Sequence, residues 1–167
     1  MQRFTLILLS TIFIAFSALP EAGAQRKFEF DVYTVFASDF RHDIGDDLCR
    51  VKGCLKKLPY TAYTRLDKKH FKLLLGRTAA IPIPGNSTLN VSPKVYYGKD
   101  AYVQVWLTGE DKGLTFYDPE NSVSILSGPA FRIKDGDKIC LVGPSTRWGT
   151  LIFVIDTDVE GLREKGI

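Results

Sequence analysis

The stretch FEFDVYTVF, residues 28–36, determines how the rest of this sequence is interpreted. One set of alternate positions carries Phe28, Phe30, Val32, Thr34 and Phe36. The positions between them carry Glu29, Asp31, Tyr33 and Val35. A period of two residues is typical of a strand that buries one face, so this stretch predicts a first strand with a strongly apolar side.

The chain after this strand repeats the same theme at short spacing. Strand-like segments follow at residues 60–66, 70–76, 79–84, 88–96, 101–108, 114–117, 121–126, 130–134, 138–142 and 149–156. Turn residues such as Gly85-Asn86, Asp118-Pro119 and Asp135-Gly136 separate them. Many short strands divided by such turns indicate an antiparallel sandwich or barrel.

One segment has helical rather than strand periodicity. Its apolar residues are Ile44, Leu48, Val51, Leu55 and Leu58, at spacings of four, three, four and three. This spacing places them on one face of a helix, with Asp43 as a candidate N-cap and Pro59 at the end. The predicted fold is therefore mostly β: an antiparallel β-sandwich with one amphipathic helix inserted after the first strand.

The segment from Ala101 to Leu107 is the candidate partner of this helix. Its alternate residues Tyr102, Gln104 and Trp106 form the face that points away from the predicted core. If the helix covers this face, these three residues have a structural role. If the face is exposed, they form a binding surface. Because five apolar residues of the helix need a partner, we expect the helix to cover it.

The beginning and end of the chain suggest export and a single domain. A basic start, the apolar residues 4–19 and the small residues Ala22-Gly23-Ala24 predict a cleavable signal peptide over residues 1–24, with no transmembrane span after cleavage. Residues 25–157 are expected to form one domain and residues 158–167 a flexible tail. The net charge of +3 is too small to suggest a nucleic-acid partner. We expect a periplasmic or secreted protein.

Three cysteines enter an oxidising compartment if this interpretation holds, which predicts one disulfide and one thiol left over. A continuous helix would hold Cys49 and Cys54 about 8.6 Å apart at Cα, too far for a bridge. If the helix ends at Gly53, the Cys49–Cys54 bridge becomes feasible. The sequence leaves these alternatives open. Cys140 lies in an apolar run, which favours a buried thiol.

The candidates for chemistry are few. His42, Asp43, Asp46 and Asp47 bring one imidazole and three carboxylates together in the sequence and could bind a metal ion. Their spacing matches neither a calcium loop nor a zinc pattern, and acidic residues at a helix start also act as caps. Neither a catalytic residue nor a cofactor can be assigned from the sequence.

The order of the segments resembles short exported bacterial β-sandwich proteins of unassigned function. The resemblance rests on Val35-Phe36-Ala37-Ser38, Leu58-Pro59-Tyr60-Thr61-Ala62-Tyr63, Leu66, Ile81-Pro82-Ile83-Pro84-Gly85, Val142-Gly143-Pro144 and Gly149-Thr150-Leu151-Ile152. It implies a β-sandwich of the bacterial envelope and brings no catalytic residues with it.

Three functions follow as hypotheses. The first is a non-enzymatic binding or adaptor module whose partner is another envelope or secreted protein. The second is a small metal-dependent hydrolase that uses the His42 and Asp43 loop. The third is a carbohydrate-binding module that uses Tyr102 and Trp106, because aromatic rings stack on sugars and serve at interfaces.

Overall fold

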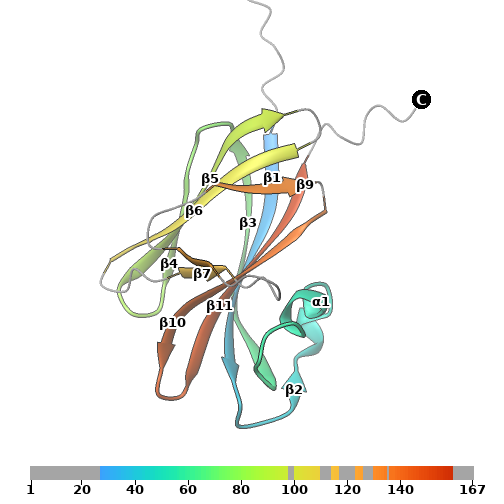
Figure 1. Ribbon diagram of the computed structural model, residues 1–167, viewed down its shortest axis with the longest axis vertical. Helices are drawn as coiled ribbons and strands as arrows, with labels where there is room; N and C mark the ends of the chain where they lie inside the picture. Colours follow the sequence, from blue (N-terminus) through green and yellow to red (C-terminus); the bar gives the residue numbers. More distant parts are fainter. Residues whose placement is uncertain are drawn as a thin grey trace, which may run out of the picture.

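The computed structural model describes residues 27–97, 100–109, 114–116, 123–125, 130–134 and 136–159 (Figure 1). The predicted signal peptide, residues 1–24, lies outside these ranges, and so do residues 160–167 of the predicted tail. Within them the chain is mostly β, with two sheets and one short α-helix. None of the helices described is long and apolar enough to cross a membrane.

The first sheet has seven strands in the order β2-β3-β1-β11-β10-β7-β8. These strands are β1 (Lys27–Ser38), β2 (Asp43–Ile44), β3 (Ala62–Leu74), β7 (Leu114–Phe116), β8 (Val123–Ile125), β10 (Lys138–Thr146) and β11 (Gly149–Val159). Neighbours are antiparallel except for β2, which runs parallel to the start of β3.

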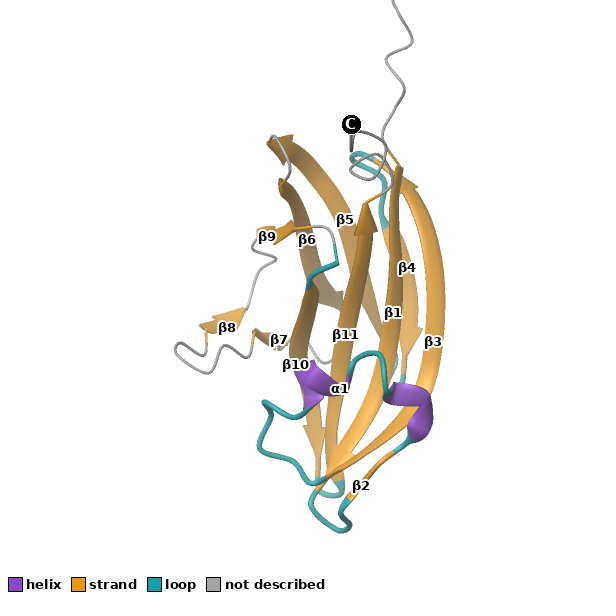
Figure 2. Ribbon diagram, turned by 90° about the vertical axis from the view of Figure 1, so that its right-hand side faces the viewer, coloured by secondary structure: helices purple, strands orange, loops and turns teal. Residues whose placement is uncertain are grey.

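The second sheet is antiparallel and has four strands in the order β4-β5-β6-β9. They are β4 (Ala79–Ile83), β5 (Ser87–Tyr97), β6 (Asp100–Thr108) and β9 (Ala130–Lys134). The two sheets face each other over much of their length (Figure 2).

The main core lies between the sheets, and the alternating residues of the first strand help to form it. Its buried members come from both sheets: Phe28, Phe30, Val32, Ile81, Ile83, Leu89, Val91, Ala101, Val103, Val105, Leu107, Ile133, Ile139, Leu141, Leu151, Phe153 and Ile155. The predicted apolar faces of the first strand and of residues 101–107 are therefore confirmed.

Two predicted boundaries differ from the structure. Residues 60–66 and 70–76 belong to one long strand, β3, which pairs with β1 throughout. The pairing skips Leu66, so a β-bulge absorbs the break in alternation that suggested two strands. In addition, β11 continues to Val159, opposite Phe28, two residues beyond the predicted end of the domain.

The helix predicted over residues 44–58 is present only in part, as short helical pieces. Asp43 and Ile44 form β2, because the amides of Asp43 and Gly45 bond to carbonyl oxygens of the 61–63 segment. A 3-10 turn (Asp46–Leu48) and the short helix α1 (Lys52–Leu55) follow. Most backbone hydrogen bonds in this region join residues three positions apart, as in a 3-10 helix. The region is therefore tightly wound and irregular. We call residues 46–58 the helical segment.

The helical segment covers a different surface from the one predicted. Its buried residues Leu48, Val51, Leu55 and Leu58 pack against the outer face of the first sheet, on Tyr33, Val35, Ala37, Tyr63, Cys140, Ile152 and Val154. They do not cover Tyr102, Gln104 and Trp106 of β6. The segment joins β2 to β3, which are neighbours in the first sheet, so it packs on the sheet that it connects.

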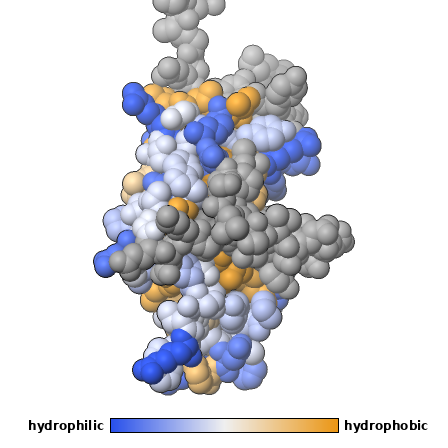
Figure 3. All heavy atoms as spheres, turned by 60° about the vertical axis from the view of Figure 1, so that its left-hand side comes forward, coloured by the Kyte–Doolittle hydropathy of each residue, from blue (hydrophilic) through white to orange (hydrophobic). Residues whose placement is uncertain are grey.

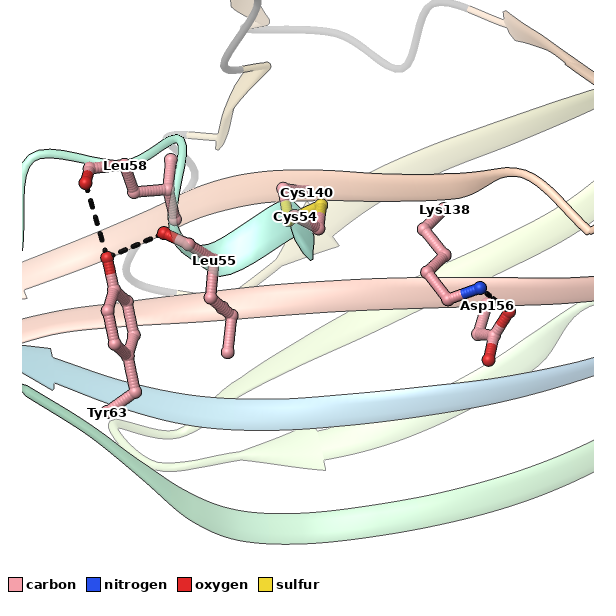
Figure 4. The surroundings of a disulfide bond; sticks show 7 residues. All are labelled: Cys54, Leu55, Leu58, Tyr63, Lys138, Cys140 and Asp156. Carbon is pink, nitrogen blue, oxygen red and sulfur yellow. Dashed lines mark hydrogen bonds and ion pairs between the residues drawn. A yellow bond between two sulfur atoms is a disulfide. The ribbon is translucent and has the colours of Figure 1, made fainter. Parts of the chain in front are cut away.

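A disulfide attaches this segment to the sheet. Cys54 of α1 is bonded to Cys140 of β10, with the Cα atoms 6.2 Å apart (Figure 4). Cys49 is a free, exposed thiol. The Cys49–Cys54 bridge and the free Cys140 thiol are therefore both wrong. Cys140 is the sheet residue beneath α1, a proximity that only the tertiary fold creates.

Candidate binding surfaces

One end of the molecule carries two exposed aromatic side chains from turns that are far apart in the sequence. Phe40 lies between β1 and β2 and is 72% exposed, and Trp148 lies in the β10–β11 hairpin and is 57% exposed. Their ring centroids are 6.5 Å apart with an interplanar angle of 51°. Both turns lie at the lower end of the molecule in Figures 1 and 2. We call Phe40 and Trp148 the aromatic pair.

The turn that carries Phe40 is held by Thr61. The Thr61 amide donates to the Ser38 carbonyl oxygen at 3.2 Å, and its hydroxyl donates to the Arg41 carbonyl oxygen at 2.6 Å. The Asp43 amide in turn donates to the Thr61 carbonyl oxygen at 3.2 Å. The backbone on both sides of Phe40 is therefore fixed to one residue, which limits the entropy that Phe40 loses when it binds.

The turn that carries Trp148 is also fixed. The Trp148 amide donates to the Thr146 hydroxyl oxygen at 3.2 Å, and that hydroxyl donates to the Gly149 carbonyl oxygen at 3.1 Å. Gly149 has a φ of 158°, and a Cβ there would collide with the Ala37 carbonyl oxygen and the Phe36 ring. Glycine thus lets the hairpin approach β1 closely, next to the turn that carries Phe40.

Charged side chains surround the aromatic pair. The Arg147 guanidinium lies 4.4 Å from the centroid of the Trp148 ring, a cation–π distance. Asp39, Arg41 and His42 on the opposite turn are all exposed. Figure 3 shows a small apolar area between hydrophilic areas at this end of the molecule. The surface therefore combines apolar rings with groups that can form ion pairs.

The four residues considered as a possible metal site are not gathered together. His42, Asp43, Asp46 and Asp47 are all exposed, and Asp47 forms an ion pair of 3.0 Å with Arg65. Asp43 belongs to β2 and is not the cap of a helix. Among the residues that the structure describes, no three histidine, cysteine or acidic side chains are placed to share a metal ion.

The predicted aromatic stripe lies on the outer face of the second sheet. Tyr102, Gln104 and Trp106 are each half-buried there, and the Lys94 ammonium lies 5.9 Å from the centroid of the Trp106 ring. The stripe is therefore neither the seat of the helical segment nor fully exposed.

From the sequence, Phe40 was not a candidate and Trp148 was one of several aromatic residues that could bind a partner but for which packing was the favoured role, although a signal for exposure was present. Phe40 precedes Arg41 and Trp148 follows Arg147. Both lie in turns between strands, where no sheet face is available to bury a large ring. An aromatic residue in a short turn is thus a better indicator of exposure than an aromatic residue within a strand.

Comparison of the chain with protein-family models, with curated proteins and with solved structures finds no match.

Proposed function

We propose that the protein is an exported, non-enzymatic β-sandwich that binds another protein of the bacterial envelope through the aromatic pair. The observation that carries this proposal is the exposure of Phe40 and Trp148, side by side, on two turns whose backbones are fixed. Aromatic residues and arginine supply most of the residues that dominate binding energy at protein interfaces. Here the Arg147 guanidinium lies over the Trp148 ring, one member of the aromatic pair.

The β-sandwich and the exported location also have support. The main core draws residues from both sheets, as two packed layers require. The Cys54–Cys140 disulfide fits a compartment in which disulfides persist, such as the bacterial periplasm. The predicted signal peptide points to the same compartment.

The experiment is a pull-down from an envelope extract of the source cells, with the native protein and variants as baits and mass spectrometry as the readout. We expect one protein to be retained by the native bait and lost from Trp148→Ala and Phe40→Ser. Leu75→Ala is the matched control, because Leu75 is also an exposed large apolar residue but follows the end of β3 that pairs with the start of β1. It should retain the partner.

Calorimetry with the purified partner then tests the site. Trp148→Ala should weaken binding by more than tenfold, in keeping with a cost of about 2 kcal/mol or more for a central aromatic residue. A partner that binds Trp148→Ala and native protein equally would refute the site. An empty pull-down with a folded native bait would argue against a protein partner altogether.

A further inference from the structure

A row of charged residues crosses four strands on the outer face of the first sheet. His70 of β3 is opposite Asp31 of β1, Asp31 is opposite Asp156 of β11, and Asp156 is opposite Lys138 of β10. Two carboxylates thus stand on adjacent strands. Like charges directly opposite each other destabilise a sheet unless cations compensate them.

The two carboxylates in the row have unequal sets of partners. Asp31 is well paired: its Oδ1 atom lies 2.9 Å from His70 Nδ1 and its Oδ2 atom 2.8 Å from Lys68 Nζ. Burial alone would raise the pKa of Asp31, but these hydrogen bonds outweigh burial and hold its pKa below the ordinary value. Asp31 is therefore ionised at neutral pH.

Asp156 is less well satisfied. Its Oδ1 atom lies 3.1 Å from Lys138 Nζ, as Figure 4 shows, and its side chain is only 6% exposed. Its Oδ2 atom is buried and accepts no hydrogen bond from any described residue. A buried acceptor without a donor costs about 1–3 kcal/mol, and more for a charged group. This oxygen is therefore the place where a ligand that donates a hydrogen bond gains most.

Arg50 of the helical segment lies over both carboxylates but binds neither closely. Its Nε atom is 3.3 Å from Asp156 Oδ2 and its Nη1 atom is 3.7 Å from Asp31 Oδ2. The Asp156 contact is an ion pair without the alignment of a hydrogen bond. The Arg50 side chain is 63% exposed, so most of it already faces solvent, and its two contacts with the carboxylates are what a ligand would have to replace.

These side chains line a cleft of about 360 Å³, large enough for a small polar group. Its charged lining residues are Glu29, Asp31, Arg50, His70, Lys138 and Asp156. An anion placed at Asp156 Oδ2 would face two carboxylates, whereas a cation would be attracted by both. A guanidinium group fits best, because its planar fork can donate to carboxylates on neighbouring strands at once.

We propose that this cleft binds the guanidinium group of a ligand, which takes the place of Arg50 between Asp31 and Asp156. Arg50 then acts as a tethered competitor that occupies the cleft in the free protein. The site is separate from the aromatic pair, and the proposal does not depend on the proposed function.

The test is a calorimetric titration of the protein with acetyl-Gly-Arg-Gly-amide. The matched control is the citrulline peptide, which has nearly the same shape without the charge. Arg50→Gln removes the competitor from an exposed position and should tighten binding of the arginine peptide several-fold, to about tenfold. Asp156→Asn should weaken it at least tenfold. Methylguanidinium distinguishes the sources: affinity equal to that of the peptide indicates a small-molecule ligand, and weaker affinity indicates an arginine of a partner chain.

Two results would overturn the proposal. One is equal affinity for the arginine and citrulline peptides. The other is weaker binding of the arginine peptide by Arg50→Gln, together with inorganic phosphate binding to the native protein, which would make Arg50 part of an anion site. If Asp156→Asn fails to fold, Arg50→Gln alone decides the question.

Discussion

The Tyr63 hydroxyl of β3 donates a hydrogen bond of 2.8 Å to the carbonyl oxygen of Leu55, the last residue of α1. The Leu58 carbonyl oxygen lies 3.4 Å from the same hydroxyl (Figure 4). The Leu55 carbonyl oxygen also accepts a hydrogen bond from the Leu58 amide at 3.0 Å, so the buried tyrosine adds a second donor at the end of the helix. The sheet thus terminates the helical segment as well as supporting it.

Tyr63→Phe should therefore lower the free energy of unfolding by about 0.5–1.5 kcal/mol, because it removes a buried hydrogen bond while the Leu55 carbonyl oxygen keeps the bond from the Leu58 amide. Urea unfolding followed by circular dichroism measures the change. Tyr60→Phe is the control: the Tyr60 hydroxyl donates to Thr150 Oγ1, which also contacts the Ser145 hydroxyl. A loss in Tyr60→Phe as large as in Tyr63→Phe would contradict this interpretation.

Removal of the disulfide by Cys54→Ser with Cys140→Ser should cost about 2–5 kcal/mol, because the bridge closes a long loop in the unfolded chain. The paired residues are 86 positions apart. Thermal unfolding measures the loss, with Cys49→Ser as a control that should unfold like the native protein.

Peptide mapping under non-reducing conditions checks the pairing itself. The structure predicts one peptide pair that joins Cys54 to Cys140 and one reactive thiol at Cys49. A Cys49–Cys54 peptide would show that this pairing is incorrect in the native protein.

The Asp31 carboxylate should make stability depend on pH in the acidic range. Its folded pKa is lowered, so its contribution is fully present above the unfolded pKa of about 3.9 and is lost as the pH falls through the lower folded value. Asp31→Asn should thus destabilise the protein at pH 7 by about 1–3 kcal/mol. The difference from the native protein should shrink below pH 4. A difference that stays constant from pH 7 to pH 2 would argue against this role.

Gly149→Ala should destabilise the β10–β11 hairpin, because the new methyl group would meet the Ala37 carbonyl oxygen and the Phe36 ring. A cost of about 1–3 kcal/mol is expected for such overpacking. Gly53→Ala is the matched control, since a Cβ at Gly53 contacts no atom within 4 Å. Thermal unfolding of the two variants should show a lower midpoint for Gly149→Ala alone.

The sequence was most informative where local pattern and burial coincide. The alternation of Phe28, Phe30 and Val32 predicted a strand correctly. These residues are buried on the face that β1 shares with its two neighbouring strands, so the sequence pattern matches the burial. The apolar positions of the helical segment were also identified correctly: Leu48, Val51, Leu55 and Leu58 are buried. Their burial required one apolar face and did not require a regular helix, so the periodicity overstated the helix.

The parts that could not be predicted depend on contacts between distant segments. Nothing near Cys140 indicates that α1 lies over it, and the pairing follows only once β10 and the helical segment share the same sheet face. The row of side chains on the outer face of the first sheet could not be predicted for the same reason. Asp31, His70, Lys138 and Asp156 lie on four strands, and only the register of those strands brings them together. The aromatic pair likewise joins two turns through the pairing of β1 with β11.

The Cys54–Cys140 bridge has one more consequence, which concerns cleavage of the chain by a protease. The strands β3 to β9, among them every strand of the second sheet, lie between the two cysteines. A protease that cuts the chain once within this interval opens a covalent ring but releases no fragment. The nicked protein would migrate as one species on a gel until a reductant separates the two pieces, one of which carries Phe40 and the other Trp148.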